Sequence, residues 1–124
     1  MARYRIALLV LVAAGALTTW ALPATARHEH ARVVSAVTVT AGKPTEFHFG
    51  LTKLTVKKGT VQFLVINKGN LPHDFKISGH KTKLLVPGQS QVLKVTFLKV
   101  GKYPFLCTVT GHAAAGMKGT FTVK

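Results

Sequence analysis

The chain has 124 residues and is strongly basic, with 17 lysines and arginines against 3 acidic residues and a formal net charge of +14. Such a charge favours acidic partners or anionic membrane surfaces. Nucleic acid is not expected as a partner, because the lysines are scattered singly through apparent strands and form no recognition motif. The lone cysteine, Cys107, excludes an internal disulfide and leaves a reactive thiol, an intermolecular bridge or a metal ligand.

Residues 1–26 have the pattern of a secretory signal peptide. The basic start "MARYR" precedes the uncharged run "IALLVLVAAGAL", and Ala24 and Ala26 occupy the positions of an A-x-A cleavage site. We therefore predict cleavage after Ala26 and an exported protein, periplasmic or extracellular. The alternative is a membrane-tethered protein that retains residues 6–22, a run at the short limit of the roughly 17–25 residues that cross a bilayer.

The remaining chain predicts one all-β domain. Residues 27–32, "RHEHAR", are polar and are expected to form a flexible N-terminus. From residue 33 apolar side chains alternate with polar ones in "VVSAVTVTA", in "TEFHFGLTKLTVKKG" and in "TVQFLVINKG", where Val61, Phe63 and Val65 share one face. Short β-like pieces continue to the closing "GTFTVK". Several short strands punctuated by glycine and proline predict an antiparallel sandwich or barrel over residues 33–124.

One glycine-rich segment between two predicted strands concentrates metal-binding side chains. It reads "CTVTGHAAAGMKG" and spaces Cys107, His112 and Met117 four residues apart. A thiolate, an imidazole and a thioether form a soft donor set that suits copper. A further histidine, His73, follows a predicted turn in "NKGNLPHDF". Taken singly, the cysteine could be a buried core thiol. Zinc could take the same donors but is redox-silent and prefers a regular tetrahedral set.

These segments resemble the type 1 (blue) copper cupredoxins of the plastocyanin and azurin group. The resemblance rests on Cys-x4-His-x4-Met, on the preceding Y-x-F-x-C and on the upstream N-x-G-x-x-x-H-D-F. It implies a Greek-key β-sandwich or barrel that binds one copper ion. The equatorial ligands would be His73, Cys107 and His112, and the weak axial ligand would be Met117. It also implies that Asp74, with Thr108, ties the two ligand loops together. Thr110 stands where family members often have proline, and Asp74 where several have asparagine.

The resemblance implies a carrier of single electrons and not an enzyme, because the chain supplies no second set of copper ligands, open substrate position or general base. The expected exit is the edge of His112, within an apolar patch of Leu71, Pro72, Ala113, Ala114 and Ala115. Surrounding lysines would steer redox proteins that have an acidic docking surface, and association with an anionic membrane surface is possible. A single small domain favours a monomer. Two alternatives stay open: a copper-binding or delivery protein without redox turnover, and a metal-free β-sandwich interaction module.

Overall fold

The computed structural model describes residues 32–124. The predicted signal peptide and all but the last residue of the predicted flexible N-terminus lie outside the described residues. Within the described part, every regular element is a strand, which confirms the all-β prediction. None of these residues forms a helix long and apolar enough to cross a membrane.

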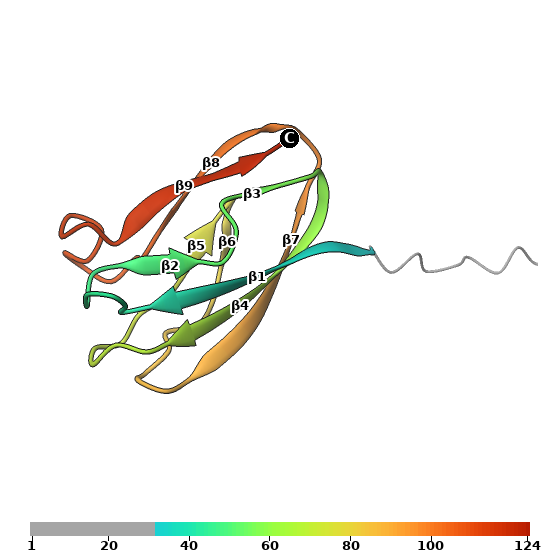
Figure 1. Cartoon of the computed structure of the whole chain (residues 1–124). Helices are drawn as coiled ribbons and strands as arrows, with labels where there is room; N and C mark the ends of the chain where they lie inside the picture. Colours follow the sequence, from blue (N-terminus) through green and yellow to red (C-terminus); the bar gives the residue numbers. More distant parts are fainter. Residues whose placement is uncertain (1–31) are drawn as a thin grey trace, which may run out of the picture.

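The strands form two sheets that pack face to face (Figure 1). The first sheet has the order β2-β1-β4-β7 and the second has the order β3-β9-β8-β5-β6. The bounds of the first sheet's strands are β1 Val33–Ala41, β2 Phe49–Leu51, β4 Gly59–Asn67 and β7 Ser90–Phe97. Those of the second are β3 Thr55–Val56, β5 Lys76–Ile77, β6 His80–Lys81, β8 Gly101–Leu106 and β9 Lys118–Val123.

The core lies between the sheets and follows the period-2 alternation of the strands. In β4 the side chains of Val61, Phe63 and Val65 are buried, as predicted, whereas Leu64 points outward. Phe63 is at the centre of the aromatic core, with ring centroids 5.5 Å from Phe75, 6.4 Å from Phe97 and 5.3 Å from Phe121. This core holds the two sheets together and fixes the positions of the loops at their ends.

The prediction of an antiparallel sandwich or barrel was wrong in one respect. Strand β1 pairs with β4 in parallel along most of its length, from Val33 opposite Thr60 to Ala41 opposite Asn67, and β3 pairs with β9 in parallel. Residues 42–58 form the crossover that a parallel pair requires. The alternation in residues 45–59 predicted more strand than forms, because only β2 and β3 join a ladder there.

The strand directions define two ends of the domain. At one end, which we call the site pole, β1, β4 and β8 end and β9 begins. At the distal pole, β4 and β8 begin and β7 and β9 end, as shown by the pairing of Gly59 with Phe97 and of Gly101 with Val123. The nine residues of β4 span about 26 Å at the usual rise of a strand. Figure 1 shows the C-terminus at the distal pole.

Candidate metal centre

Two loops at the site pole bring two histidines and the cysteine together. His73 follows the turn after β4 and is held by a β-bridge to Leu85, in which each backbone N–H donates to the other residue's carbonyl, at 3.0 and 2.8 Å. Cys107 follows β8 directly, and His112 lies in the loop between β8 and β9. His73, Cys107 and His112 form a buried cluster of potential metal ligands, although His73 is 34 residues from the cysteine in sequence.

The loop from Cys107 to Met117 folds back on itself through backbone hydrogen bonds. The Cys107 N–H donates to the Met117 carbonyl and the Met117 N–H to the His112 carbonyl, each at 3.0 Å. Gly111 and Gly116 have φ angles of 83° and 113°, in a region that side chains with a Cβ rarely adopt. The Met117 side chain is fully buried. His112 and Met117, the other two predicted donors of this loop, therefore sit in a closed, internally bonded turn beside the cysteine.

The separations of the donor atoms fit one metal ion. The two Nδ1 atoms of His73 and His112 are 3.1 Å apart, and the Cys107 Sγ lies 4.0 Å from the first and 3.6 Å from the second. Three N and S donors placed trigonally at bond lengths of about 2.0–2.3 Å would be separated by about 3.5–3.7 Å. The observed values bracket this range. One thiolate and two imidazoles, with a thioether in the same loop, form the soft set that favours copper.

Burial sets the protonation of the metal-free cluster. Desolvation raises the pKa of the Cys107 thiol above its ordinary value, so the sulfur keeps its proton at neutral pH. Desolvation is the main cause that lowers the pKa of His112. The imidazole of His112 is therefore neutral near pH 7 and has a lone pair available for a metal, whereas the thiol must lose a proton when a metal binds.

This difference predicts how metal affinity depends on pH. With redox-silent Zn²⁺ as the probe, the affinity between pH 7 and 8.5 should rise about tenfold per pH unit, because binding displaces the thiol proton. Calorimetric titrations in buffers of different ionisation enthalpy should count about one proton released per ion. The variant His48→Ala, which alters an exposed histidine outside the cluster, should give the same slope. An affinity independent of pH would contradict a protonated thiol in the metal-free protein.

Glu46, which was not among the predicted site residues, contacts the outer nitrogen of His73. Its Oε1 lies 2.7 Å from His73 Nε2, and its carboxylate also accepts hydrogen bonds from the backbone N–H groups of Asn70 and Leu71. The Asn70 bond is the main cause that lowers the pKa of Glu46 to about 2. The side chain is 22 % exposed. A carboxylate on one ring nitrogen fixes the tautomer, so that Nδ1 of His73 faces the cluster as an acceptor.

Gly69 leaves room for this carboxylate, and Asn67 holds the loop that contains Gly69. Gly69 packs so closely that a Cβ there would lie against Glu46 Oε1 and 3.0 Å from His73 Nε2. The buried Asn67 amide donates to the carbonyls of Leu71 and Leu85, each at 2.8 Å, and its oxygen accepts from the Gly69 N–H. In the sequence these two residues form part of a turn signal and are the first two fixed positions of N-x-G-x-x-x-H-D-F. They shape the approach of His73 to the site.

Asp74 joins the two ligand loops, and Thr108 is its partner. The Thr108 N–H donates to Asp74 Oδ1 at 2.6 Å, and the Thr108 hydroxyl donates to the second carboxylate oxygen. Lys81 Nζ lies 3.6 Å from that second oxygen. The carboxylate is buried, and both hydrogen bonds link the residue after His73 to the residue after Cys107. This link limits how far the two ligands can separate.

The expected electron-exit patch around His112 is present, but the ring of His112 is more buried than expected and is covered in part by Phe47. The residues of the expected patch do lie on the surface of the domain. Three are exposed, Leu71, Ala114 and Ala115, and two are half-buried, Pro72 and Ala113. His112 itself is only 8 % exposed, and Phe47 packs edge-on against its ring, with centroids 5.0 Å apart. The alternation in residues 45–59 predicts a strand at Phe47. In the structure it lies in the crossover before β2, where it adds an aromatic ring to the patch.

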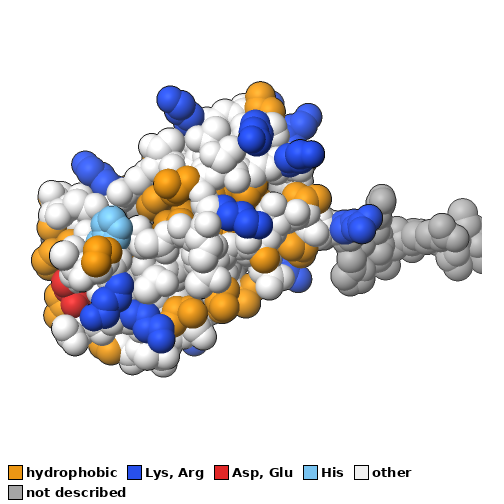
Figure 2. All heavy atoms as spheres, in the orientation of Figure 1, with side chains coloured by type: hydrophobic (Ala, Val, Ile, Leu, Met, Phe, Trp, Pro, Cys, Tyr) orange, Lys and Arg blue, Asp and Glu red, His pale blue; other side chains and the backbone are white. Residues whose placement is uncertain are grey.

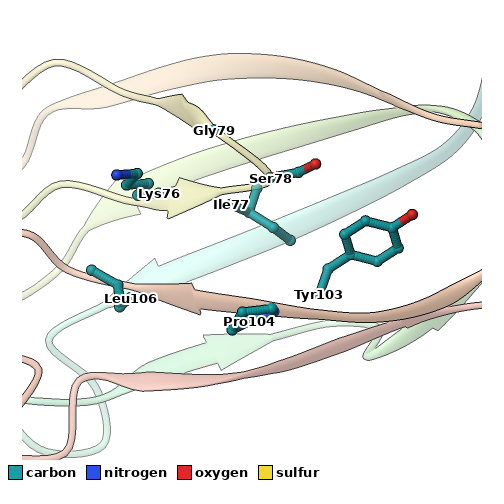
Figure 3. Close-up of a pocket in the computed structure, with 7 residues that line it drawn as sticks. All are labelled: Lys76, Ile77, Ser78, Gly79, Tyr103, Pro104 and Leu106. Carbon is teal, nitrogen blue, oxygen red and sulfur yellow. The ribbon is translucent and has the colours of Figure 1, made fainter.

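Two further histidines and a surface cleft lie outside the cluster of His73, Cys107 and His112. His48 is exposed, and His80 is exposed with its Nδ1 2.9 Å from the carbonyl of Ser78. A cleft of about 270 Å³ opens on the second sheet between β5 and β8 (Figure 3). Its lining contains no histidine, cysteine or carboxylate and consists of Lys76, Ile77, Ser78, Gly79, Tyr103, Pro104 and Leu106. This cleft offers no metal donors.

The comparisons agree with the fold and the motifs. A family model described as a cupredoxin-like domain matches residues 10–123. No curated protein matches the chain. Among solved structures, auracyanin B is similar with a TM-score of 0.64 and 20% identity, covering 75% of this chain and 91% of that chain.

Two further solved structures have the same fold. Auracyanin A, a "blue" copper protein from the green thermophilic photosynthetic bacterium Chloroflexus aurantiacus, has a TM-score of 0.59 and 16% identity, covering 72% of this chain and 98% of that chain. Rusticyanin from Thiobacillus ferrooxidans has a TM-score of 0.62 and 24% identity, covering 73% of this chain and 77% of that chain. The family match spans nearly the whole sequence and confirms the resemblance read from the motifs: the chain belongs to the cupredoxin-like domain family.

Proposed function

We propose that the protein is a type 1 blue-copper protein that carries single electrons between exported or membrane-bound redox partners. The observation that carries this proposal is the buried meeting of His73, Cys107 and His112, with nitrogen and sulfur donors 3.1–4.0 Å apart. Bound copper would supply one-electron redox chemistry, and the donor set suits both of its common oxidation states. The two histidines, the cysteine and the Met117 thioether would hold the ion.

The protein's own contribution would be to keep the donors in nearly the same places in both oxidation states. Glu46 orients His73, the Asp74–Thr108 link ties the loops, and the backbone bonds of Cys107 and Met117 close the second loop. Ligands that move little require little reorganisation when an electron arrives or leaves. The apolar surroundings of the sulfur exclude water and help to set the reduction potential.

Electron transfer without catalysis fits the residues around the site. Among the described residues, one cluster has the composition and spacing of a metal site, and its donors are buried instead of lining an open cleft. Electrons would leave through His112 and the patch that contains Leu71 and Phe47. Partners would be redox proteins with acidic docking surfaces, and the carrier would work as an exported monomer that can associate with anionic membranes.

The visible spectrum of the copper-loaded protein tests the proposal. Loading with Cu²⁺ should give an intense blue colour, because a thiolate bound to Cu²⁺ absorbs strongly by charge transfer, and a reductant should bleach it reversibly. The His48→Ala variant, altered at an exposed residue, should behave in the same way. Tight Cu⁺ binding without a stable coloured Cu²⁺ form would favour copper delivery instead. No binding of either ion would leave a metal-free interaction domain.

A further inference from the structure

The distal pole carries an exposed apolar turn between β7 and β8. Leu98 is 80 % exposed and Val100 is 62 % exposed, the largest values among the large hydrophobic side chains of residues 32–124. Both lie in the short connection from Phe97 to Gly101, at the far end of the domain from His73. Water-exposed leucine and valine side chains at the tip of a turn are suited to burial in a partner surface.

Basic side chains surround this turn. The ends of the strands bring their segments together: the Lys58 N–H donates to the Lys124 carbonyl at 3.1 Å, and Gly101 pairs with Val123. The exposed basic residues at this pole are Arg32, Lys57, Lys58, Lys99, Lys102 and Lys124. The two acidic residues of the described chain, Glu46 and Asp74, both lie at the site pole. Figure 2 shows acidic side chains at one end of the visible face only, whereas basic and hydrophobic side chains appear at both ends.

The chain that precedes the described residues also joins the domain at the distal pole. Arg32 is the first described residue, and Val33 pairs with Thr60 at the start of β4. Upstream in the sequence is the uncharged apolar run of residues 6–22. If that run is retained in a membrane, the link to Val33 is ten residues long, so the distal pole is the part of the domain nearest to the bilayer.

We propose that the distal pole binds the surface of an anionic lipid bilayer, with Leu98 and Val100 entering the headgroup region and the lysines meeting lipid phosphates. Apolar side chains ringed by lysines have the composition that binds such surfaces. The inference deepens the membrane association proposed above and rests on the exported location. It points the site pole, about 26 Å away along β4, toward the aqueous side, where redox partners can reach it.

A tryptophan placed on the turn tests this directly. In the exported protein, the fluorescence of the Leu98→Trp variant should shift to the blue and be quenched by brominated lipids in vesicles rich in phosphatidylglycerol. The matched control is Val92→Trp, at an exposed hydrophobic position on the outer face of β7. It should show little quenching. Trp20, if retained, contributes equally to both variants. Equal quenching at the two positions would overturn the proposal.

Charge removal gives a second, independent measurement. The double variant Lys99→Gln/Lys102→Gln should lower vesicle affinity about 30-fold, since each lysine near an anionic surface contributes roughly a fivefold factor. The same charge removed from the site pole, in Lys68→Gln/Lys118→Gln, should change it much less. Equal losses in both pairs would overturn the proposal. Neither experiment requires copper, so a blue protein whose distal turn is not quenched would fail this inference alone.

Discussion

Replacing Cys107 with serine is expected to abolish the blue colour of the copper-loaded protein. The colour of a type 1 site comes from charge transfer between a thiolate sulfur and Cu²⁺, and a hydroxyl oxygen does not supply it. The sulfur is buried 4.0 and 3.6 Å from the two histidine nitrogens, and the chain has one cysteine, so no other thiolate can take its place. Visible absorption and electron paramagnetic resonance spectra of the loaded variant would measure the loss.

A loop variant that keeps every donor distinguishes this result from general damage. Val109→Ala removes part of a half-buried side chain two residues beyond the cysteine and should keep the full colour. Circular dichroism should show that both variants retain the β-sandwich. An intense blue band in folded Cys107→Ser would refute the assignment of the cysteine as a ligand.

Replacing Glu46 with alanine should lower copper affinity about 10- to 100-fold, the usual cost of losing the partner of a ligating histidine. The change removes the acceptor 2.7 Å from His73 Nε2 and leaves the N–H groups of Asn70 and Leu71 without their carboxylate. Losing a negative charge beside the site also disfavours Cu²⁺ more than Cu⁺, so the reduction potential should rise. Chelator competition and voltammetry would measure the two effects.

Two further variants separate the charge from the contact. Glu46→Gln keeps an oxygen acceptor without the charge, so it should raise the potential while losing less affinity than the alanine variant. His48→Ala, two positions along the same crossover, should leave affinity and potential unchanged. If Glu46→Ala matches the unaltered protein in both quantities, the carboxylate does not position His73.

The strands could be predicted because each carries its own alternation. Val61, Phe63 and Val65 mark the inner face of β4 without any knowledge of what packs on them, and burial bears this out. The pairing of the strands could not be predicted in the same way. The apolar pattern of β1 is compatible with either direction of its neighbour, and its parallel contact with β4 depends on how residues 42–58 cross over.

The site residues differ in the same way. Some stand in a local sequence motif, and others are identified only by contacts between distant parts of the chain. Cys107, His112 and Met117 stand at regular spacing in one loop, so the pattern was visible in the sequence. Glu46 is 27 residues from His73 and has no motif around it, and only the folded crossover shows their contact. One signal could have found it: acidic residues are so rare in this chain that each one merits an explanation. Phe47 gave no such signal, because a phenylalanine in an alternating run resembles a core residue.

The parallel pairing of β1 and β4 bears on how this chain can tolerate change. A hairpin between antiparallel neighbours can be shortened to two residues, but a parallel pair obliges the backbone to travel the length of the sheet and return. Here the return path supplies the wall of the metal centre, through Glu46 behind one imidazole and Phe47 against the other. A deletion in residues 42–48 would therefore damage the chemistry even where the sandwich survived it. Engineering that seeks a smaller scaffold should spare this connection and trim elsewhere.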